Sequence, residues 1–291
     1  MSLEQITWEQ EEKVQRLRKK YNHETASHAF QSLYLWAPAM GLSIELEEDF
    51  FAVKAEKRGA NTWFFPCGSQ EAKKAFLERH IGEENFTVCY AREEDAAFAM
   101  EHFPGYFDFE ERAGDSEYLY WKEEQIGLKG RKFSKLRGHI HKATRAMKLE
   151  VRLLTRENIG EAGEIARQWN RLSHEEGEDG LIDLNAADRL LNNWDRLKAS
   201  GILVTVDGEP YAIAGGYALT EDTFDLCMAK QKGYLPGLSQ YVKWQFYLSL
   251  PGQYAWVNAE EDLGIEGLRM MKKQMQPAAR IRMFDGKVAV T

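Results

Sequence analysis

The chain has 291 residues, of which 44% are apolar and 12% aromatic, so it can bury a sizeable core and is not a disordered polymer. Its length suits two domains of roughly 150 residues each. The formal net charge of −8 excludes a protein that coats nucleic acid with its whole surface, although a local basic patch is compatible with it.

The first half of the chain predicts short helices and strands of an α+β domain. Helices are expected at 8–21, 70–80 and 93–100, and strands at 50–55, 62–66, 86–90 and 118–120. The aromatic run at 30–36 fits a buried helix turn or a strand equally well. The short polar loop at Gly59 predicts an antiparallel meander, so we expect a mostly antiparallel sheet.

A basic segment separates the two halves. From Leu128 to Leu149 the sequence contains eight basic residues and no acidic one, which leaves the rest of the chain with a net charge of −16. Apolar residues at helical spacing predict a basic helix over 128–148 that links a first domain at 1–127 to a second at 149–291. This face either binds a polyanion or is a solvated surface that balances acidic neighbours.

The second half predicts a regular order: a strand, two helices, three meandering strands, then helix, strand, helix and strand. The expected elements lie at 149–154, 157–172, 185–198, 201–206, 211–218, 223–232, 238–250, 254–258, 265–273 and 280–284. Asp207-Gly208 indicates a tight hairpin turn, and Gly215-Gly216 indicates a bulge or a close backbone approach.

The stretch from Thr223 to Leu250 predicts a buried strand, a Gly- and Pro-bearing turn and a long helix in succession. A helix that begins directly after such a turn leaves its first backbone N–H groups without partners, and the helix dipole makes this end attractive to an anion. The candidate ligands for an anionic cofactor group are Lys230, Lys232, Gly233, Gly237 and Leu238. The alternative is a plain strand-to-helix connection that binds nothing.

The three cysteines have no CxxC spacing. They are predicted to be small buried apolar side chains of a protein in a reducing cytoplasm, and not disulfides or metal ligands. No metal site is predicted, because His139 and His141 diverge on the helix that we expect there. The polar, acidic N-terminus is no signal peptide, and no apolar run reaches the roughly 18 to 20 residues of a membrane span. We therefore expect a cytoplasmic protein, for which a peripheral position at a membrane remains open.

Several short motifs occur together with this order of elements. They include Phe65-Pro66, Leu128-Lys129-Gly130, Pro236-Gly237, Asn258, the run Glu261-Asp262-Leu263-Gly264-Ile265 and the run Gly267-Leu268-Arg269. In these motifs the chain resembles the bacterial family related to the C-terminal domain of phosphatidylglycerol lysyltransferases, which is built from two tandem GNAT-like acyltransferase domains. The resemblance covers nearly the whole chain, and the block from Asn258 to Lys273 is its most specific part.

The resemblance implies a transferase site in the second domain, in a cleft between two splayed strands. The lysyltransferases take an aminoacyl group from aminoacyl-tRNA to a lipid head group, and ordinary GNAT enzymes use acyl-CoA held at the turn before the helix. Glu261 and Asp262 are candidates for orienting or deprotonating the acceptor, and Arg269 for gripping a phosphate or pairing with Asp262. Alternatively, Asp262 caps the helix that starts near Gly264, and Arg269 forms a structural salt bridge. The candidate tRNA ligands are Lys129, Arg131, Lys132, Lys135 and Arg137.

Two positions depart from the family pattern. The family usually carries a histidine and an acidic residue before the lysine, where this chain has Cys227 and Ala229. A lost carboxylate removes a candidate general base. Two hypotheses therefore stand: a transferase that moves an acyl or aminoacyl group from aminoacyl-tRNA or acyl-CoA to an amine or hydroxyl, or an inactive GNAT-like binding or regulatory module.

Overall fold

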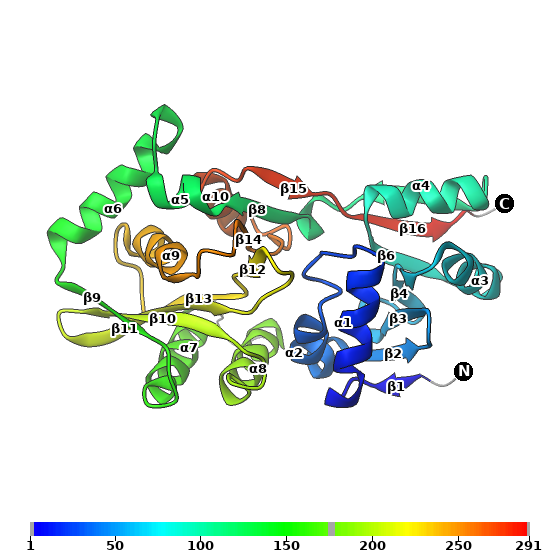
Figure 1. Cartoon of the computed structure of the whole chain (residues 1–291), viewed down its shortest axis with the longest axis horizontal. Coiled ribbons are helices and arrows are strands. Elements are labelled where there is room, and N and C mark those ends of the chain that lie inside the picture. Colours follow the sequence, from blue (N-terminus) through cyan, green and yellow to red (C-terminus); the bar gives the residue numbers. More distant parts are fainter. Residues whose placement is uncertain (1–2, 174–177, 290–291) are drawn as a thin grey trace. The chain divides into compact units, whose positions relative to one another are not determined.

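The computed structural model describes residues 3–173 and 178–289, with side chains throughout except at 173–182 (Figure 1). The chain divides into two compact units. The first unit contains the residues up to Glu117, the segment Glu261–Gly264 and the residues from Arg280 onward. The second contains Tyr118–Glu260 and Ile265–Ala279. Each unit is described by itself.

The first unit is built on an eight-stranded sheet with the order β1-β2-β3-β4-β6-β16-β7, in which β5 also pairs with β3. Its strands are β1 (Glu4–Gln5), β2 (Leu42–Leu46), β3 (Phe50–Ala55), β4 (Thr62–Phe64), β5 (Cys67–Gly68), β6 (Thr87–Ala91), β7 (Phe107–Glu111) and β16 (Phe284–Val288). Its helices are α1 (Glu11–Lys20), α2 (Phe30–Met40), α3 (Gln70–His80) and α4 (Glu93–His102). The pairing is antiparallel except between β4 and β6.

Alternation along the strands gives this sheet two apolar faces. On β3, Phe51 and Val53 pack into the core cluster that contains Val14 of α1 and Leu33 of α2. The intervening residues of β3 pack into a second cluster with Phe76 of α3 and with Phe98 and Ala99 of α4. Successive side chains of a strand point to opposite faces, so one strand serves both cores. The aromatic run at 30–36 is helical, and α2 ends at Gly41 with a φ of 61°.

The second unit contains two four-stranded sheets, β13-β11-β10-β9 and β12-β14-β8-β15. The strands are β8 (Glu117–Trp121), β9 (Leu149–Leu153), β10 (Ser200–Val206), β11 (Glu209–Gly216), β12 (Thr223–Asp225), β13 (Met228–Gln231), β14 (Trp256–Asn258) and β15 (Ala279–Ile281). The helices are α5 (Lys122–Gly127), α6 (Ser134–Ala146), α7 (Ile159–Ser173), α8 (Glu178–Asn192), α9 (Leu238–Ser249) and α10 (Glu266–Gln274).

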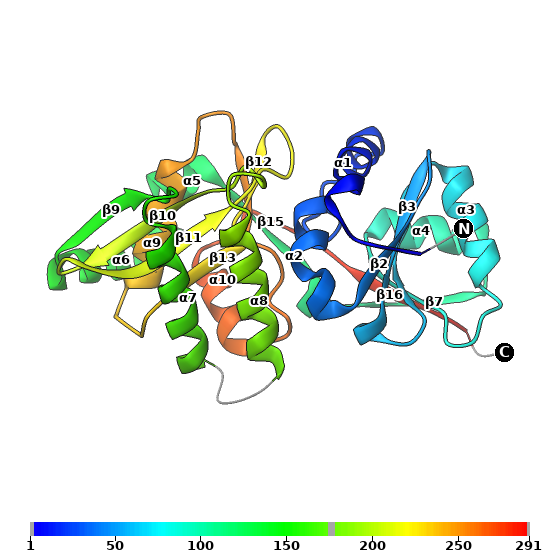
Figure 2. The ribbon, with the colours of Figure 1, turned by 90° about the horizontal axis from the view of Figure 1, so that it is seen from below.

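Helices cover both faces of the β13-β11-β10-β9 sheet: α7 and α8 lie on one face, and α9 and α6 on the other (Figures 1 and 2). Ile202 and Val204 of β10 pack with Phe246 of α9 and Ile140 of α6 in one core cluster. The apolar stripe of the basic segment therefore serves to seat α6 on α9, as its helical spacing predicted.

Three boundaries differ from the expectations. The helix expected at 185–198 begins earlier, at Glu178. The strand expected at 223–232 is broken after Asp225 into β12 and β13, which join different sheets. The last expected strand is replaced by β15 and β16, and β16 pairs with β6 and β7, so the C-terminal residues belong to the first unit. Sequence periodicity could not predict that β16 pairs with strands of the first unit, because the periodicity indicates which residues are buried and not which strand is the partner.

Candidate functional site

The strands that were expected to splay do diverge. β12 and β14 run parallel, with Thr223 opposite Trp256 and Asp225 opposite Asn258. Beyond Asp225 the chain turns into β13, which is the edge strand of the other sheet and pairs with β11. β13 and β14 therefore belong to different sheets and separate beyond Asp225, at the position from which an acyltransferase site would be built.

Lys230 lies on β13 and is engaged by the protein itself. Its Nζ is 2.5 Å from Oδ2 of Asp183 on α8 and 3.7 Å from the ring centroid of Trp169 on α7. Burial lowers the pKa of Lys230, and the carboxylate of Asp183 opposes that shift. Because this charge is already paired, its expected role toward an anionic donor group requires displacement of Asp183. Lys232, by contrast, is half-buried, and the part of the chain that the structure describes shows no ion pair for it.

Asp225 is a fully buried carboxylate at the point where β12 ends, and sequence reasoning passed over it. It lies beside Tyr217 and Cys227: burial and this carboxylate together raise the pKa of the Tyr217 hydroxyl and of the Cys227 thiol. Both groups are therefore protonated at neutral pH and can donate hydrogen bonds. The signal that could have revealed it is an aspartate inside an otherwise apolar strand.

Gly237 has the conformation that glycine permits, with a φ of 83° immediately before α9. A Cβ at this position would lie 2.0 Å from the carbonyl oxygen of His139 on α6, so the close approach of α6 accounts for this glycine. Gly237 and Leu238 are buried. The side of Gly237 where a Cβ would lie thus faces α6. A ligand at the start of α9 would contact the backbone N–H groups of the residues after Gly237.

The basic segment presents most of its charge to solvent. Five of its side chains have no ion pair or hydrogen bond within the described ranges: Lys129, Arg131, Lys135, Lys142 and Arg145. A shallow surface hollow on α6 is lined by Gly138, His141, Lys142 and Arg145. Two other predicted ligands are occupied: Lys132 pairs with Glu124 at 2.7 Å, and Arg137 donates to the Leu128 and Gly130 carbonyls.

The predicted acceptor residues belong to the loop of the first unit. Asp262 is fully buried, and its Oδ1 accepts the N–H of Gly264 at 2.9 Å. Helix α10 begins at Glu266 with Ile265 as its N-cap, so the expectation that Asp262 caps this helix is wrong: it stabilises the preceding turn. Burial and the carboxylate of Glu261 raise the pKa of Tyr90. Arg269 lies in the first turns of α10, in the second unit.

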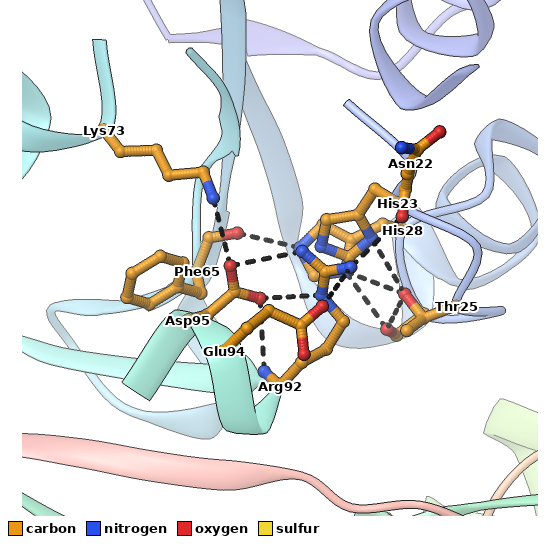
Figure 3. Close-up of polar contacts among 10 residues, drawn as sticks. Asn22, His23, Thr25, His28, Phe65, Lys73, Arg92, Glu94 and Asp95 are labelled. Carbon is orange, nitrogen blue, oxygen red and sulfur yellow. Dashed lines mark hydrogen bonds and ion pairs between the residues drawn. The ribbon is translucent and has the colours of Figure 1, made fainter. Parts of the chain in front are cut away.

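A second polar cluster, in the first unit, was not predicted (Figure 3). Asp95 is fully buried and receives hydrogen bonds from Arg92 Nε at 2.8 Å and Lys73 Nζ at 3.1 Å. His28 Nε2 lies 2.8 Å from the Phe65 carbonyl, and so donates to it. The His23 ring contacts the His28 ring in a tilted arrangement, with a centroid distance of 4.0 Å and an interplanar angle of 35°. This cluster ties the α1–α2 connection to α4. The Arg92-x-x-Asp95 capping spacing was the available signal.

Comparison with known proteins assigns the fold. The sequence matches the family model of the phosphatidylglycerol lysyltransferase C-terminal region over residues 18–284. The chain belongs to this family. No curated protein matches the sequence significantly.

Solved structures agree with that assignment. A Bacteroides thetaiotaomicron protein of unknown function is 23% identical, with a TM-score of 0.87 over 99% of this chain and 100% of its own. L-PGS from Bacillus licheniformis is 14% identical, with a TM-score of 0.62 over 98% and 93%. FemX is 10% identical, with a TM-score of 0.61 over 98% and 97%. The expected α+β architecture of two tandem GNAT-like domains is confirmed.

Family and fold are those of GNAT-like transferases. In the segments that the structure describes, no helix is long and apolar enough to cross a membrane. The same segments contain no group of three or more histidine, cysteine or acidic side chains placed to hold a metal ion.

Proposed function

We propose that the chain is an aminoacyltransferase that takes its donor group from aminoacyl-tRNA and passes it to an amine or hydroxyl of a small molecule or lipid head group. The observation that carries the proposal is the exposed basic surface of α6 and the turn before it. In a chain with a net charge of −8, five neighbouring cationic side chains there lack acidic partners among the described residues. Such a surface suits the closely spaced phosphates of a folded RNA.

The family supports the same donor, because its model is named for phosphatidylglycerol lysyltransferases. The divergence of β13 from β14 provides a place for the reactive end of the donor, and Asp225 is the last residue of β12 before the chain turns into β13. Its carboxylate is a candidate to orient or deprotonate the acceptor, with Tyr217 and Cys227 as neighbouring hydrogen-bond donors. Independently of Asp225, Glu261 and Asp262 of the first unit are proposed to orient or deprotonate an acceptor, and Arg269 of the second unit is proposed to bind a phosphate.

Titration with intact tRNA at a series of salt concentrations tests this proposal. Each phosphate neutralised contributes a log–log slope of roughly −0.7 to −0.9, so the wild type is expected to lose affinity steeply as salt rises. A variant with Lys129, Arg131 and Lys135 changed to glutamine removes up to three such contacts and is expected to flatten the slope by about 2 to 3 units.

Lys57→Gln is the matched control, because this exposed lysine of the first unit also lacks an ion pair within the described residues. It is expected to leave both affinity and slope unchanged. No tRNA binding at low salt, or equal slopes for the wild type and the triple variant, contradicts the tRNA donor. Calorimetry with acetyl-CoA then tests the CoA donor in the same preparation.

One observation favours the inactive binding module. Lys230, the most conspicuous cation of the predicted donor site, is neutralised by Asp183, and Ala229 supplies no carboxylate beside it. The module is distinguished by tRNA or ligand binding that is never followed by transfer of the acyl group.

A further inference from the structure

Strand β9 forms an open edge of the second unit. It is the outermost strand of the β13-β11-β10-β9 sheet (Figures 1 and 2), and in the parts of the chain that the structure describes no strand pairs with its outer side. Its pairing with β10 continues in unbroken register from Leu149 to Leu153. Proteins usually protect an open edge with a proline, a bulge or a charge, because it can take up a further strand. β9 has only charges, those of Glu150 and Arg152.

The hydrogen bonds at the two ends of β9 show which of its backbone groups face the open edge. The Leu154 N–H donates to the Gly201 carbonyl at 2.9 Å, and the Lys148 carbonyl accepts from the Asp207 N–H at 2.8 Å. Hydrogen-bonded and non-bonded pairs alternate along an antiparallel ladder, so the even-numbered residues direct their backbone groups toward β10. The odd-numbered residues therefore direct their N–H and C=O groups outward, in the plane of the sheet: Leu149, Val151 and Leu153.

The side chains of β9 differ between the two faces of the sheet. The odd-numbered ones share a face with residues of β10 that belong to the core cluster under α9: Val206, Val204 and Ile202. Leu149 packs against that cluster, whereas Val151 is 37% and Leu153 is 63% exposed. The charged side chains of Glu150 and Arg152 lie on the other face. Two neighbouring apolar side chains are thus left partly in water beside the open edge.

The sequence of β9, LEVRL, is complementary to itself in the antiparallel direction. When Val151 of two copies lie opposite each other, Leu149 lies opposite Leu153 of the second copy. Glu150 then lies opposite Arg152, and Arg152 opposite Glu150. The residues that meet across the edge in hydrogen-bonded pairs are the odd-numbered ones, whose backbone groups face outward. Apolar side chains would therefore meet on one face of the joined sheet, and opposite charges on the other.

The same charges select this register over the others. A shift of two residues places Glu150 opposite Glu150 or Arg152 opposite Arg152, and like charges directly opposite each other are destabilising. A shift of one residue brings the outward backbone groups out of alignment. Within one copy, Arg152 pairs with Glu161 at 2.6 Å and Glu150 with Lys148 at 3.2 Å. These four side chains are all at least 35% exposed, and such surface pairs are weak enough for the side chains to reach a second copy.

We propose that β9 is a dimer interface, at which two copies of this chain pair antiparallel about Val151. The two four-stranded sheets then form one continuous sheet across a two-fold axis. The partner is a second copy, because an isologous contact requires a surface that complements itself and the charge order of β9 does so. Pairing removes Val151 and Leu153 from water and satisfies the outward backbone groups. The dimer does not depend on the proposed transferase function.

Analytical ultracentrifugation of the full chain over a range of protein concentrations measures the dissociation constant of the dimer. The wild type is expected to dimerise. Glu150→Arg and Arg152→Glu each place like charges opposite one another in both symmetry-related pairs, and are each expected to weaken the dimer by at least about tenfold. The double variant restores opposite charges and is expected to dimerise within about threefold of the wild type. Glu110→Arg, on the exposed face of the edge strand β7 in the first unit, is the matched control and is expected to change nothing.

An equimolar mixture of Glu150→Arg and Arg152→Glu separates pairing of the edges from misfolding. In a mixed dimer one β9 carries two positive charges and the other two negative ones, so both cross-strand pairs are attractive. The mixture is expected to associate about as tightly as the wild type, although each variant alone is largely monomeric and keeps the wild-type circular dichroism spectrum. A wild type that stays monomeric at every concentration, single variants that dimerise like the wild type, or a mixture that associates no more tightly than its components overturns the proposal.

Discussion

His23 and His28 lie in the interior of the first unit, where the surrounding residues require them to be neutral. Burial lowers the pKa of His28 to about 3 and that of His23 well below its usual value. The charges of Arg92 and Arg18 add to this effect. By contrast, the buried charges of the same cluster are paired, as Asp95 is by Arg92 and Lys73. The cluster therefore stabilises the fold only while its imidazoles carry no proton.

This arrangement predicts a pH-dependent stability. In the unfolded chain both histidines titrate near pH 6.5, whereas folded His28 titrates near 3, so between these values the unfolded chain binds more protons. The histidine contribution is complete above pH 6.5 and falls as the pH drops, by up to about 1.4 kcal/mol per pH unit for each histidine. Urea unfolding between pH 7 and pH 5 measures it. His28→Gln, which can still donate to the Phe65 carbonyl, is expected to show about half the slope of the wild type. Equal slopes contradict this account.

At the scale of elements, the junction of α6 and α9 determines what the Gly237 turn can do. The backbone of α6 approaches Gly237 so closely that a side chain would overlap the His139 carbonyl. The glycine that suggested a ligand in the sequence is thus explained by helix packing, and the N-terminal turn of α9 with Ser239 is the part left half-exposed.

Gly237→Ala is therefore expected to destabilise the second unit by about 2 to 4 kcal/mol, because it combines a left-handed φ with a backbone overlap. Gly138→Ala is the control: it lies on α6 with no atom within 4 Å of its added Cβ, and is expected to be neutral or to stabilise the protein by up to about 1 kcal/mol. Urea denaturation midpoints measure both. A Gly237→Ala protein as stable as the wild type contradicts this explanation of the glycine.

Most elements could be predicted from the sequence because they depend on local periodicity. The α6 stripe of Leu136 and Ile140 is an example, as is the strand at β10. The break between β12 and β13 could not be predicted, because the residues on both sides are apolar and only the partner strands differ. The same limit applies to the candidate site: Asp225 is of interest because it is buried, and the burial of a single polar residue depends on tertiary packing, which the local sequence does not show.

At the scale of the molecule, the family match and the two compact units give the chain a transferase architecture. The polar residues divide into three groups: a paired structural cluster around Asp95, an exposed basic surface on α6, and the buried Asp225 with its neighbours Tyr217 and Cys227. The basic side chains of α6 and the turn before it that lack acidic partners among the described residues are the ones that the proposed function assigns to tRNA.

The most direct test of an aminoacyl-tRNA donor is transfer itself. A tRNA pool charged with radiolabelled amino acids is incubated with the full chain, with phosphatidylglycerol vesicles in one arm and a mixture of small amines and alcohols in the other. We expect the label to leave tRNA and appear in acceptor in one arm, more slowly when Lys129, Arg131 and Lys135 are glutamine. Label that leaves tRNA only at the protein-free rate of hydrolysis in both arms contradicts the account.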